Sequence, residues 1–492
     1  MSSADPILIG IDIGTTNVKA VAVGAGGRVL GVQRRRMVIH TPAPGATEFD
    51  LSALDEALIG LLSDTAAQLE AEGHDAGRVA AISVAAIGES FVGLDADDRP
   101  VLPCPTWYDR RTSAYRTGTG LSAEAWFDTT GMVDDDIYTI WRMMWWRQER
   151  PEAMARAKRW FSVSDYALYR LGGAHVAHPG LAARTGLADR HSLNWSDDQL
   201  ALAGVKRDAM PRLLLQGTIA GHLTERVARA TGLGAGVALV NAGHDHPCAG
   251  LGSGMIAPGT FVNSAGTAES LIALVDRPLG HAETGGGEYD CYPHAAPGRF
   301  LLSGHIPTSG AAIDWMMAHA GGAADADAAA VAPGASGVRV APYLQGSGSP
   351  WNRRDARLRM DGIDAGTGGA ELIRATYEGL AAWLSISLAR FEAQTGQAPA
   401  ELMLTGGGSR HAAYTAIKAA LLDRTLVASD VPEAAGIGAA MVGGLAVGVW
   451  DSAEEAARAV TADMETRRIA PDPDLRAAYA PLADNLRAFV TP

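Results

Sequence analysis

Apolar runs alternate with short polar and glycine-rich turns along the first hundred residues. The segment ILIGIDIGTTNVKAVAVGAGGRVLGVQRRRMVI holds three β-rich runs broken at GTTN and GAGG, which is typical of a β-meander. In the next segment, Leu51, Leu54, Leu58, Leu62 and Leu69 lie near one helical stripe. Residues 79–95 then return to strand character. The pattern predicts the order β-β-β-α-β.

A similar pattern returns in the second half. Residues 259–278 read as strand, small-residue turn and strand, and Gly266-Thr267 lies 252 positions after Gly14-Thr15, close to half the chain length. Further on, apolar spacing predicts helices over residues 371–391 and 411–423, and a strand before the glycines of LTGGGS. We expect an α/β protein with two related mixed-sheet domains, residues 1–250 and 251–492.

Composition narrows the function classes. The 492 residues, 47% hydrophobic, are enough for two or more cores. The net charge of −14 would repel a polyanion, so we expect no nucleic-acid partner. Three scattered cysteines make no disulfide framework, and MSSADPILIG lacks a signal-peptide pattern, so a cytoplasmic location is expected. Residues 434–450 are uncharged but too short to span a bilayer, which predicts a buried, closely packed helix and no membrane partner.

Two Gly-Thr turns have the chemistry of phosphate loops. In DIGTTNVKA, Asp12 ends a strand and is placed to hold a hydrated Mg²⁺. The turn residues that follow are Gly14, Thr15, Thr16 and Asn17, with Lys19 beginning the return strand. NSAGTAES repeats this arrangement with Ser264, Gly266 and Thr267. The alternative is a pair of hairpins whose polar turns only face water.

The segment LTGGGSR follows a strand and opens a helix. Its residues Gly406, Gly407, Gly408 and Ser409 would let a flat ring or a phosphate approach the backbone. It matches neither G-x-G-x-x-G nor a P-loop, which disfavours dinucleotide binding. A plain strand-to-helix connection is an equally good interpretation.

Two further segments carry groups suited to gripping a polyol. WYDRRT contains Trp107, Asp109 and Arg111, and IGES contains Glu89. Aromatic rings stack on C–H faces, and charged groups bond hydroxyls. The alternative for WYDRRT is a surface loop with an Asp–Arg ion pair.

In NAGHDHPCAG, Asp245 stands between His244 and His246. A metal centre would need further ligands, and the chain has no H-x-x-x-H or H-E-x-x-H helix to supply them. A strand end with satisfied histidines and a catalytic carboxylate both remain open from this segment alone.

Set in order, these segments resemble the FGGY carbohydrate kinase family of the actin, hexokinase and Hsp70 fold group. DIGTTNVKA looks like its first phosphate loop, AGHDHPCAGLGSG like its catalytic-Asp segment and NSAGTAESL like its second phosphate loop. PYLQGSGSPWNRRDARLRMDGI, LTGGGSRHAAYTAIKAALLDRTLV and EAAGIGAAMVGG are similar to later family segments. The matches run from residue 7 to about residue 447.

The resemblance implies two actin-like (ribonuclease H-like) domains, each a mixed sheet flanked by helices, with the active site in the interdomain cleft. It implies an ATP-dependent kinase in which Asp245 is the general base and Asp12 and Asp245 organise Mg²⁺. The Gly14–Lys19 and Ser264–Thr267 turns would bind phosphates, and Gly406–Ser409 would flank adenosine.

On the substrate side the resemblance implies a ketose or polyol. Glu89 stands where xylulose kinases carry a histidine and glycerol kinases a glutamate. Trp107, Asp109, Arg111 and His246 are the other expected sugar contacts. A homodimer is compatible with this interpretation. The rival classes are a non-catalytic nucleotide-binding regulator on the same fold and a His/Asp metal hydrolase.

Overall fold

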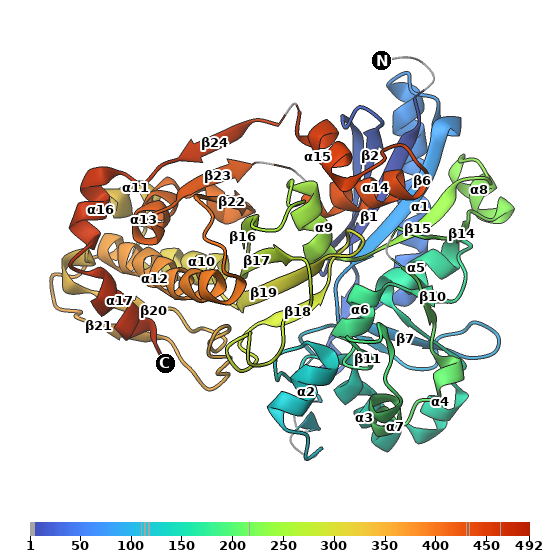
Figure 1. Ribbon diagram of the computed structural model, residues 1–492, viewed down its shortest axis with the longest axis horizontal. Helices are drawn as coiled ribbons and strands as arrows, with labels where there is room; N and C mark the ends of the chain where they lie inside the picture. The colour runs from blue at the N-terminus through green and yellow to red at the C-terminus, as the bar shows by residue number, and fades with distance from the viewer. Residues whose placement is uncertain are drawn as a thin grey trace.

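Two mixed β-sheets organise the chain, and they lie side by side in the ribbon of Figure 1. The computed structural model describes residues 5–109, 111–112, 115–116, 119–215, 217–429, 431, 433–462 and 464–492. The expected α/β architecture with one sheet in each half is confirmed.

The first sheet has six strands in the order β14-β15-β6-β1-β2-β3. Its strands are β1 (Ile7–Ile13), β2 (Asn17–Gly24), β3 (Val29–Arg36), β6 (Val79–Ala86), β14 (Ile219–His222) and β15 (Ala238–His244). The first three form the predicted antiparallel meander, and β6 and β15 add in parallel. Helix α1 (Leu51–Ala71) packs across β2 and β3 with its leucine stripe buried. The predicted β-β-β-α-β order is therefore confirmed.

The second sheet has seven strands in the order β18-β19-β17-β16-β22-β23-β24. They are β16 (Phe261–Ala265), β17 (Glu269–Val275), β18 (Asp290–Pro293), β19 (Phe300–Ile306), β22 (Glu401–Thr405), β23 (Thr425–Ser429) and β24 (Thr466–Ile469). A hairpin, a third antiparallel strand and two parallel strands recur here as in the first sheet. The predicted relation between the two halves is thus seen in their strand order.

Helices and minor strands surround the sheets. The first half carries α2 (Ala123–Thr130), α3 (Thr139–Glu149), α4 (Pro151–Arg156), α5 (Val163–Leu171), α6 (Pro179–Arg184), α7 (Asp197–Ala203) and α8 (Glu225–Thr231). The second half carries α10 (Gly310–His319), α11 (Asp325–Ala330), α12 (Gly369–Thr395), α13 (Ala412–Leu422), α15 (Ala453–Thr461), α16 (Pro473–Tyr479) and α17 (Ala483–Val490). Short strands are β4 (Ile39–His40), β5 (Glu48–Phe49), β8 (Cys104–Pro105), β10 (Val176–Ala177), β11 (Ala188–Asp189), β12 (Asn194–Trp195), β13 (Arg212–Leu213), β20 (Arg339–Ala341) and β21 (Arg359–Asp361).

Residues 79–95 do not form the single strand expected from their apolar character. The strand β6 ends at Ala86, and β7 (Phe91–Leu94) leaves the sheet to pair with β9 (Arg159–Ser162). Between them Glu89 adopts a left-handed backbone with φ of 61°, which is unfavourable for a residue with a Cβ. Hydrophobicity alone does not reveal this break.

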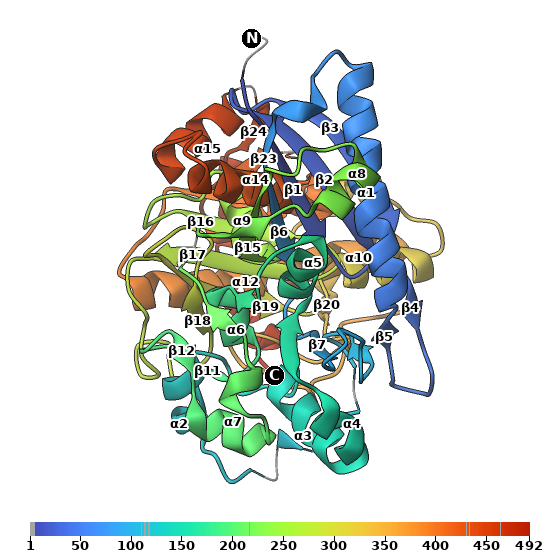
Figure 2. The ribbon, with the colours of Figure 1, turned by 90° about the vertical axis from the view of Figure 1, so that its right-hand side faces the viewer.

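Helix α14 (Ala434–Ala446) returns to the first sheet and packs on β1 and on α9 (Asp245–Gly252). A Cβ at Gly10 would lie 1.8 Å from the Gly436 carbonyl oxygen, and one at Gly438 would lie 1.9 Å from the Cys248 carbonyl oxygen. Glycines therefore permit this contact, and the prediction of a buried, closely packed helix is confirmed. Figure 1 shows α9 between the two sheets, and Figure 2 shows it beneath α14. None of the helices in the described part of the chain has the length and apolar character needed to span a bilayer.

Candidate active site

Asp245 stands where the first sheet gives way to a helix. Strand β15 ends at His244, and α9 begins at Asp245 itself. Gly243 has φ of 87° at a register irregularity, and a Cβ there would lie 2.4 Å from Nδ1 of His178. Glycine at this position thus lets the chain turn, and the turn places the Asp245 carboxylate at the N-terminus of α9.

The Asp245 carboxylate is partly reachable from solvent. Its side chain is 20% exposed, and Oδ1 has no hydrogen bond of acceptable geometry, although Nε2 of His244 lies 3.2 Å away. The His246 ring stacks on His244 at 5.1 Å between centroids and is half exposed. Burial raises the pKa of Asp245 to about 7. This side chain can therefore exchange a proton near neutral pH.

His244 is held by the opposite half of the chain. Its Nδ1 lies 2.9 Å from the hydroxyl of Tyr292 on β18. Burial lowers the pKa of His244 well below its ordinary value, so the ring is neutral at pH 7. The arrangement fixes the ring beside Asp245 without adding a positive charge.

Asp12 lies close to Asp245. In the β1–β2 register it is directly opposite Lys19, whose Nζ lies 3.6 Å from its Oδ2 and 2.7 Å from Oε2 of Glu433. Burial and the charge of Asp245 raise the pKa of Asp12 to about 7. Its Oδ1 is buried without a hydrogen-bond partner in the described structure. Two carboxylates that repel each other, each with an unpaired oxygen, fit a hard cation such as Mg²⁺.

Asp12 and Asp245 would supply the acidic ligands of such a site. Among the described residues, no group of three or more His, Cys, Asp or Glu side chains is arranged to hold a metal ion. Mg²⁺ commonly uses one or two carboxylates and completes its shell with water and substrate phosphates. The donor set at Asp12 and Asp245 therefore suits Mg²⁺ bound together with a nucleotide.

The first predicted phosphate turn connects β1 and β2. The Gly14 amide donates to the Asn17 carbonyl at 3.0 Å, which closes the turn. Thr16 is exposed, and the Thr15 hydroxyl accepts a hydrogen bond of 3.0 Å from Nε1 of Trp107. The turn is thus tight, and it contacts the loop that contains WYDRRT.

The second predicted phosphate turn connects β16 and β17. The Gly266 amide donates to the Ala268 carbonyl at 2.8 Å, Ser264 is partly buried and Thr267 is exposed. A Cβ at Gly406 would lie 2.5 Å from the Ala265 carbonyl oxygen. The glycine segment 406–409 therefore rests directly on this turn. The structure brings these two predicted nucleotide contacts together.

Glu89 lies in a buried ion cluster that joins the two halves. Its Oε1 accepts a hydrogen bond of 2.6 Å from Nε of Arg184 on α6. NH1 of Arg184 donates a second hydrogen bond, also of 2.6 Å, to Asp290 on β18. The backbone carbonyl of Glu89 accepts a hydrogen bond of 2.7 Å from the Thr139 hydroxyl. This bond helps to hold Glu89 in its left-handed conformation. Burial raises the pKa of Glu89 although Arg184 opposes the shift. A Cβ at Gly88 would lie 3.3 Å from Nε2 of His244, so the cluster adjoins the Asp245 segment.

Neighbouring groups satisfy the two charged residues of the WYDRRT loop that the structure describes, Asp109 and Arg111. Asp109 is buried and accepts from the Thr47 amide at 2.9 Å and from NH2 of Arg111 at 2.8 Å. Arg111 also pairs with Glu48 at 2.8 Å and stacks on Trp145 at 4.7 Å. The Asp–Arg ion pair considered for this loop is therefore present.

Four residues around the site were missed from the sequence: Arg184, Asp290, Tyr292 and Glu433. Each is a single charged or polar residue in an ordinary segment, and only tertiary packing brings it to Glu89, His244 or Asp12. Glu433 could have been noted, because it begins the EAAGIGAAMVGG segment that resembles the family.

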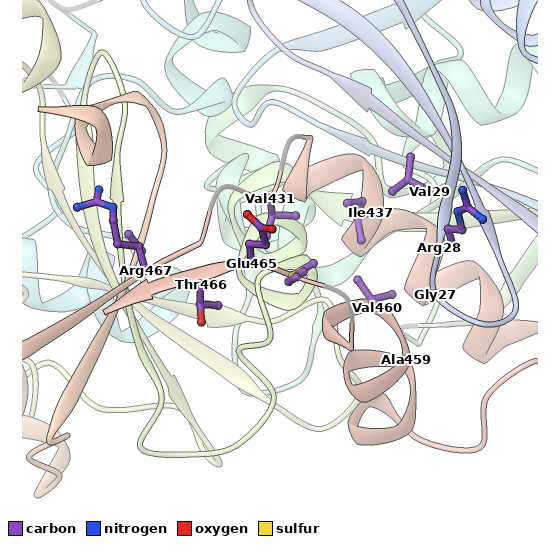
Figure 3. Close-up of a pocket in the computed structure, with 12 residues that line it drawn as sticks. Gly27, Arg28, Val29, Val431, Ile437, Ala459, Val460, Glu465, Thr466 and Arg467 are labelled. Atoms are coloured by element: carbon purple, nitrogen blue, oxygen red, sulfur yellow. The ribbon is translucent and has the colours of Figure 1, made fainter. Parts of the chain in front are cut away.

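A cavity of about 520 Å³ lies away from these groups, between the β2–β3 turn, α14, α15 and β24 (Figure 3). Its described lining includes Val29, Ile437, Val460 and Thr466, and it includes none of the predicted site residues. The cavity is therefore separate from the candidate active site.

The chain is similar to known carbohydrate kinases over most of its length. The models of the FGGY family of carbohydrate kinases match residues 7–252 (N-terminal domain) and 261–447 (C-terminal domain). A glycerol kinase of Bordetella parapertussis is 28% identical over 474 residues, covering 92% of this chain and 91% of the relative. A gluconokinase of Bacillus subtilis is 24% identical over 463 residues, covering 90% and 88%.

Solved structures show the same fold. A structure described as a xyloylose kinase from Brucella ovis superposes with a TM-score of 0.90 at 24% identity, covering 98% of both chains. Plasmodium falciparum glycerol kinase with ADP gives 0.88 at 17% identity, covering 99% of both. The resemblance found in the sequence is confirmed, and so is the actin-like fold. The chain therefore belongs to the FGGY family of carbohydrate kinases, which are ATP-dependent phosphotransferases.

Proposed function

We propose that this kinase transfers the γ-phosphate of ATP to a hydroxyl of a small, uncharged ketose or polyol, with Asp245 as the general base. The observation that carries the proposal is the Asp245 carboxylate at the N-terminus of α9, partly exposed and with an unpaired oxygen. Such a group can accept the proton of an attacking hydroxyl.

For phosphoryl transfer, the protein mainly has to position the reacting groups. Phosphoryl transfer is accelerated mainly by positioning and charge stabilisation, and a base adds roughly 10²- to 10⁴-fold. A base is most effective when its pKa is close to the working pH, and burial raises the pKa of Asp245 to about 7. We propose that the sugar hydroxyl lies beside Asp245 and gives up its proton as the new P–O bond forms.

The nucleotide contacts follow from the turns. We propose that Gly14, Thr15, Thr16, Asn17 and Lys19 contact the phosphates from the first sheet, and Ser264, Gly266 and Thr267 from the second. Gly406, Gly407, Gly408 and Ser409 would flank adenosine. Asp12 and Asp245 would hold Mg²⁺, which when bound neutralises charge on the phosphates. The unpaired oxygens of both carboxylates support this assignment.

The charge balance near Glu89 favours an uncharged acceptor. Arg184 is bonded on one side by Glu89 and on the other by Asp290. The buried Arg142, whose NH1 donates to the Glu89 carbonyl at 3.2 Å, brings this cluster to charge balance, so the Asp245 carboxylate is the negative charge that an acceptor meets. A sugar carboxylate would be repelled here, whereas hydroxyls can donate to these oxygens. Among the acceptors named for the relatives, we propose glycerol- or xylulose-like compounds over gluconate.

We expect the remaining proposed sugar contacts to contribute unequally to sugar binding. The rings of His246 and Trp107 are accessible to a sugar, because His246 is half exposed and Trp107 is only partly buried. Asp109 and Arg111 stay proposed contacts, but they already bond each other and their neighbours. We therefore expect smaller effects on the sugar KM from substituting Asp109 or Arg111 than from substituting Glu89.

The organisation of the protein is proposed from the same account. We propose that the sugar and first phosphate contacts belong to a domain of residues 1–250, and the adenosine contacts to residues 251–492. A cytoplasmic location and a homodimer are further proposals.

ADP release measured with Mg²⁺-ATP and a panel of glycerol, D-xylulose, other ketoses and polyols, and D-gluconate tests the function. We expect release with at least one uncharged acceptor and little with gluconate. Nucleotide binding without ADP release on any acceptor would favour the regulator. Hydrolysis without ATP, with stoichiometric Zn or Mn in the purified protein, would favour the metal hydrolase.

A further inference from the structure

A buried ion pair lies behind the second predicted phosphate turn. Nζ of Lys418 on α13 donates to Oε1 of Glu269 on β17 at 2.7 Å, and both side chains are fully buried. An ammonium and a carboxylate removed from water at this depth are costly unless every group is satisfied. The surrounding contacts therefore decide whether the pair is tolerated.

All four acceptor positions of the Glu269 carboxylate are used. Oε1 also accepts from Nδ2 of Asn263 at 2.8 Å, and Oε2 accepts from the hydroxyls of Ser309 and Tyr414 at 2.5 and 2.8 Å. Lys418 donates a second bond to Oδ1 of Asn263 at 2.7 Å. Burial would raise the pKa of Glu269, but Lys418 and these donors hold it below its ordinary value, so the carboxylate is charged. Burial lowers the pKa of Lys418 although Glu269 opposes the shift, and the Nζ–Oε1 distance of 2.7 Å is that of an ion pair.

The members of this network come from the segments that would contact ATP. Asn263 and Glu269 flank the second turn on β16 and β17. Ser309 precedes α10, whose first amides donate to the carbonyls of Gly266 and Thr267 at 3.0 Å. Lys418 belongs to α13, the helix that follows the glycine segment 406–409. One side-chain network thus ties the turn to the helix behind the adenosine segment.

We propose that Glu269 and Lys418 are positioning residues that set the separation between the second phosphate turn and the glycine segment. This inference rests on the proposed nucleotide contacts of those two segments. ATP must reach both at once, whereas adenosine alone needs only the glycine segment. The pair therefore favours ATP over adenosine without touching either.

An ion pair suits a positioning role better than an apolar contact, because its hydrogen bonds are directional. Apolar side chains would fill the same volume, but they would not fix the hairpin and helix in one relative position as these five directed bonds do. A fully satisfied polar network is rigid and specifies a single arrangement. The hydrophobic core does not need either charge, so we infer that the role of the Glu269–Lys418 pair is to fix this geometry.

A second buried pair in the same half offers a matched control. Nε of Arg374 donates to Oε1 of Glu378 at 3.0 Å within α12, and both side chains are almost fully buried. The hydroxyl of Tyr479 donates to the same oxygen at 2.7 Å. These partners belong to α12 and α16, not to the turn or the glycine segment.

The test compares Glu269→Gln/Lys418→Met with Arg374→Met/Glu378→Gln. Calorimetric titration of ATP with Mg²⁺, and of adenosine, gives the ratio of the two affinities for each protein. In the first double variant we expect this ratio to fall about tenfold, the effect of one or two weakened phosphate hydrogen bonds, with adenosine binding and the sugar KM unchanged. The control should lose thermal stability and keep the wild-type ratio.

An unchanged ratio in a folded Glu269→Gln/Lys418→Met protein would overturn the inference, as would an equal fall in the control. Tyr414→Phe removes a single bond to Glu269 and keeps the ring, so it tests the same point if the double variant does not fold. A fall of about threefold is expected there, and no fall would overturn the inference. Wild-type protein that binds ATP but phosphorylates no acceptor would contradict the proposed function, while the binding ratios would still test the positioning role.

Discussion

Glu89→Ala probes the sugar side most sharply, because Glu89 is the buried carboxylate for which both a substrate role and a structural role can be stated. Its Oε1 is 2.6 Å from Nε of Arg184, and its backbone is left-handed. If the carboxylate also accepts a sugar hydroxyl, alanine removes a charged hydrogen bond worth about 1.5–3 kcal/mol. The KM for the sugar should then rise roughly 10- to 150-fold, with the KM for ATP nearly unchanged.

The structural cost of this substitution can be separated from the binding effect. Arg184 keeps its bond to Asp290, so the loss should stay below the ~3–5 kcal/mol of a buried charge left without any partner. Glu89→Gly removes the same carboxylate but relieves the left-handed backbone, which costs about 1–2 kcal/mol for other residues. The glycine variant should therefore be the more stable of the two, with the same sugar KM.

Steady-state ADP release, with each substrate varied while the other is saturating, measures both constants. Urea unfolding of the two variants measures their stability. Equal rises in both KM values, or a loss of stability with an unchanged sugar KM, would refute the reasoning and leave Glu89 a purely structural partner of Arg184.

Three further predictions concern the metal, the packing and the pH dependence. Asp12→Asn should raise the Mg²⁺ concentration for half-maximal rate by at least about tenfold, the loss of one charged ligand; a magnesium titration showing no shift would contradict this. Gly10→Ala should destabilise by ~1–3 kcal/mol or more in chemical denaturation, because its Cβ would lie 1.8 Å from the Gly436 carbonyl oxygen, whereas a Cβ at Gly26 meets nothing within 4 Å and Gly26→Ala should be near neutral. Burial lowers the pKa of His178 from 6.5 to about 4, so the neutral ring contributes stability above pH 6.5 that is lost as the pH falls toward 4. His178→Asn keeps a capping acceptor for α6 and should reduce the loss of unfolding free energy between pH 7 and 4.5. Chemical denaturation of the wild-type and variant proteins across this range measures the loss, and parallel pH curves would contradict the prediction.

Much of the fold could be predicted because its signals are local. The β-meander, the leucine stripe of α1 and the helices around Tyr377 and Tyr414 follow from apolar spacing within single segments. The repeated Gly-Thr turn also indicated two related halves, and the strand orders agree. The break at Glu89 could not be predicted, because the residues on both sides are equally apolar and tertiary bonds hold the left-handed backbone.

The site was only partly predictable for a related reason. Asp12 and Asp245 lie in recognisable segments, so their roles could be inferred before their proximity was known. Arg184 and Asp290 lie 95 and 201 residues from Glu89 along the chain, and nothing in their own segments indicates that they meet it. Glu269 and Lys418 lie 149 residues apart along the chain, and charged residues on a strand and a helix are usually expected at the surface.

In the proposed mechanism, Asp245 removes the proton from the acceptor hydroxyl. The most direct measurement is the rate of ADP release by Asp245→Asn with the best acceptor, together with its affinity for ATP. Asparagine keeps the size of the side chain but cannot act as the base. We predict a fall in kcat of about 10²-fold or more with ATP affinity nearly intact; a near-normal kcat in a folded Asp245→Asn protein would show that Asp245 is not the base.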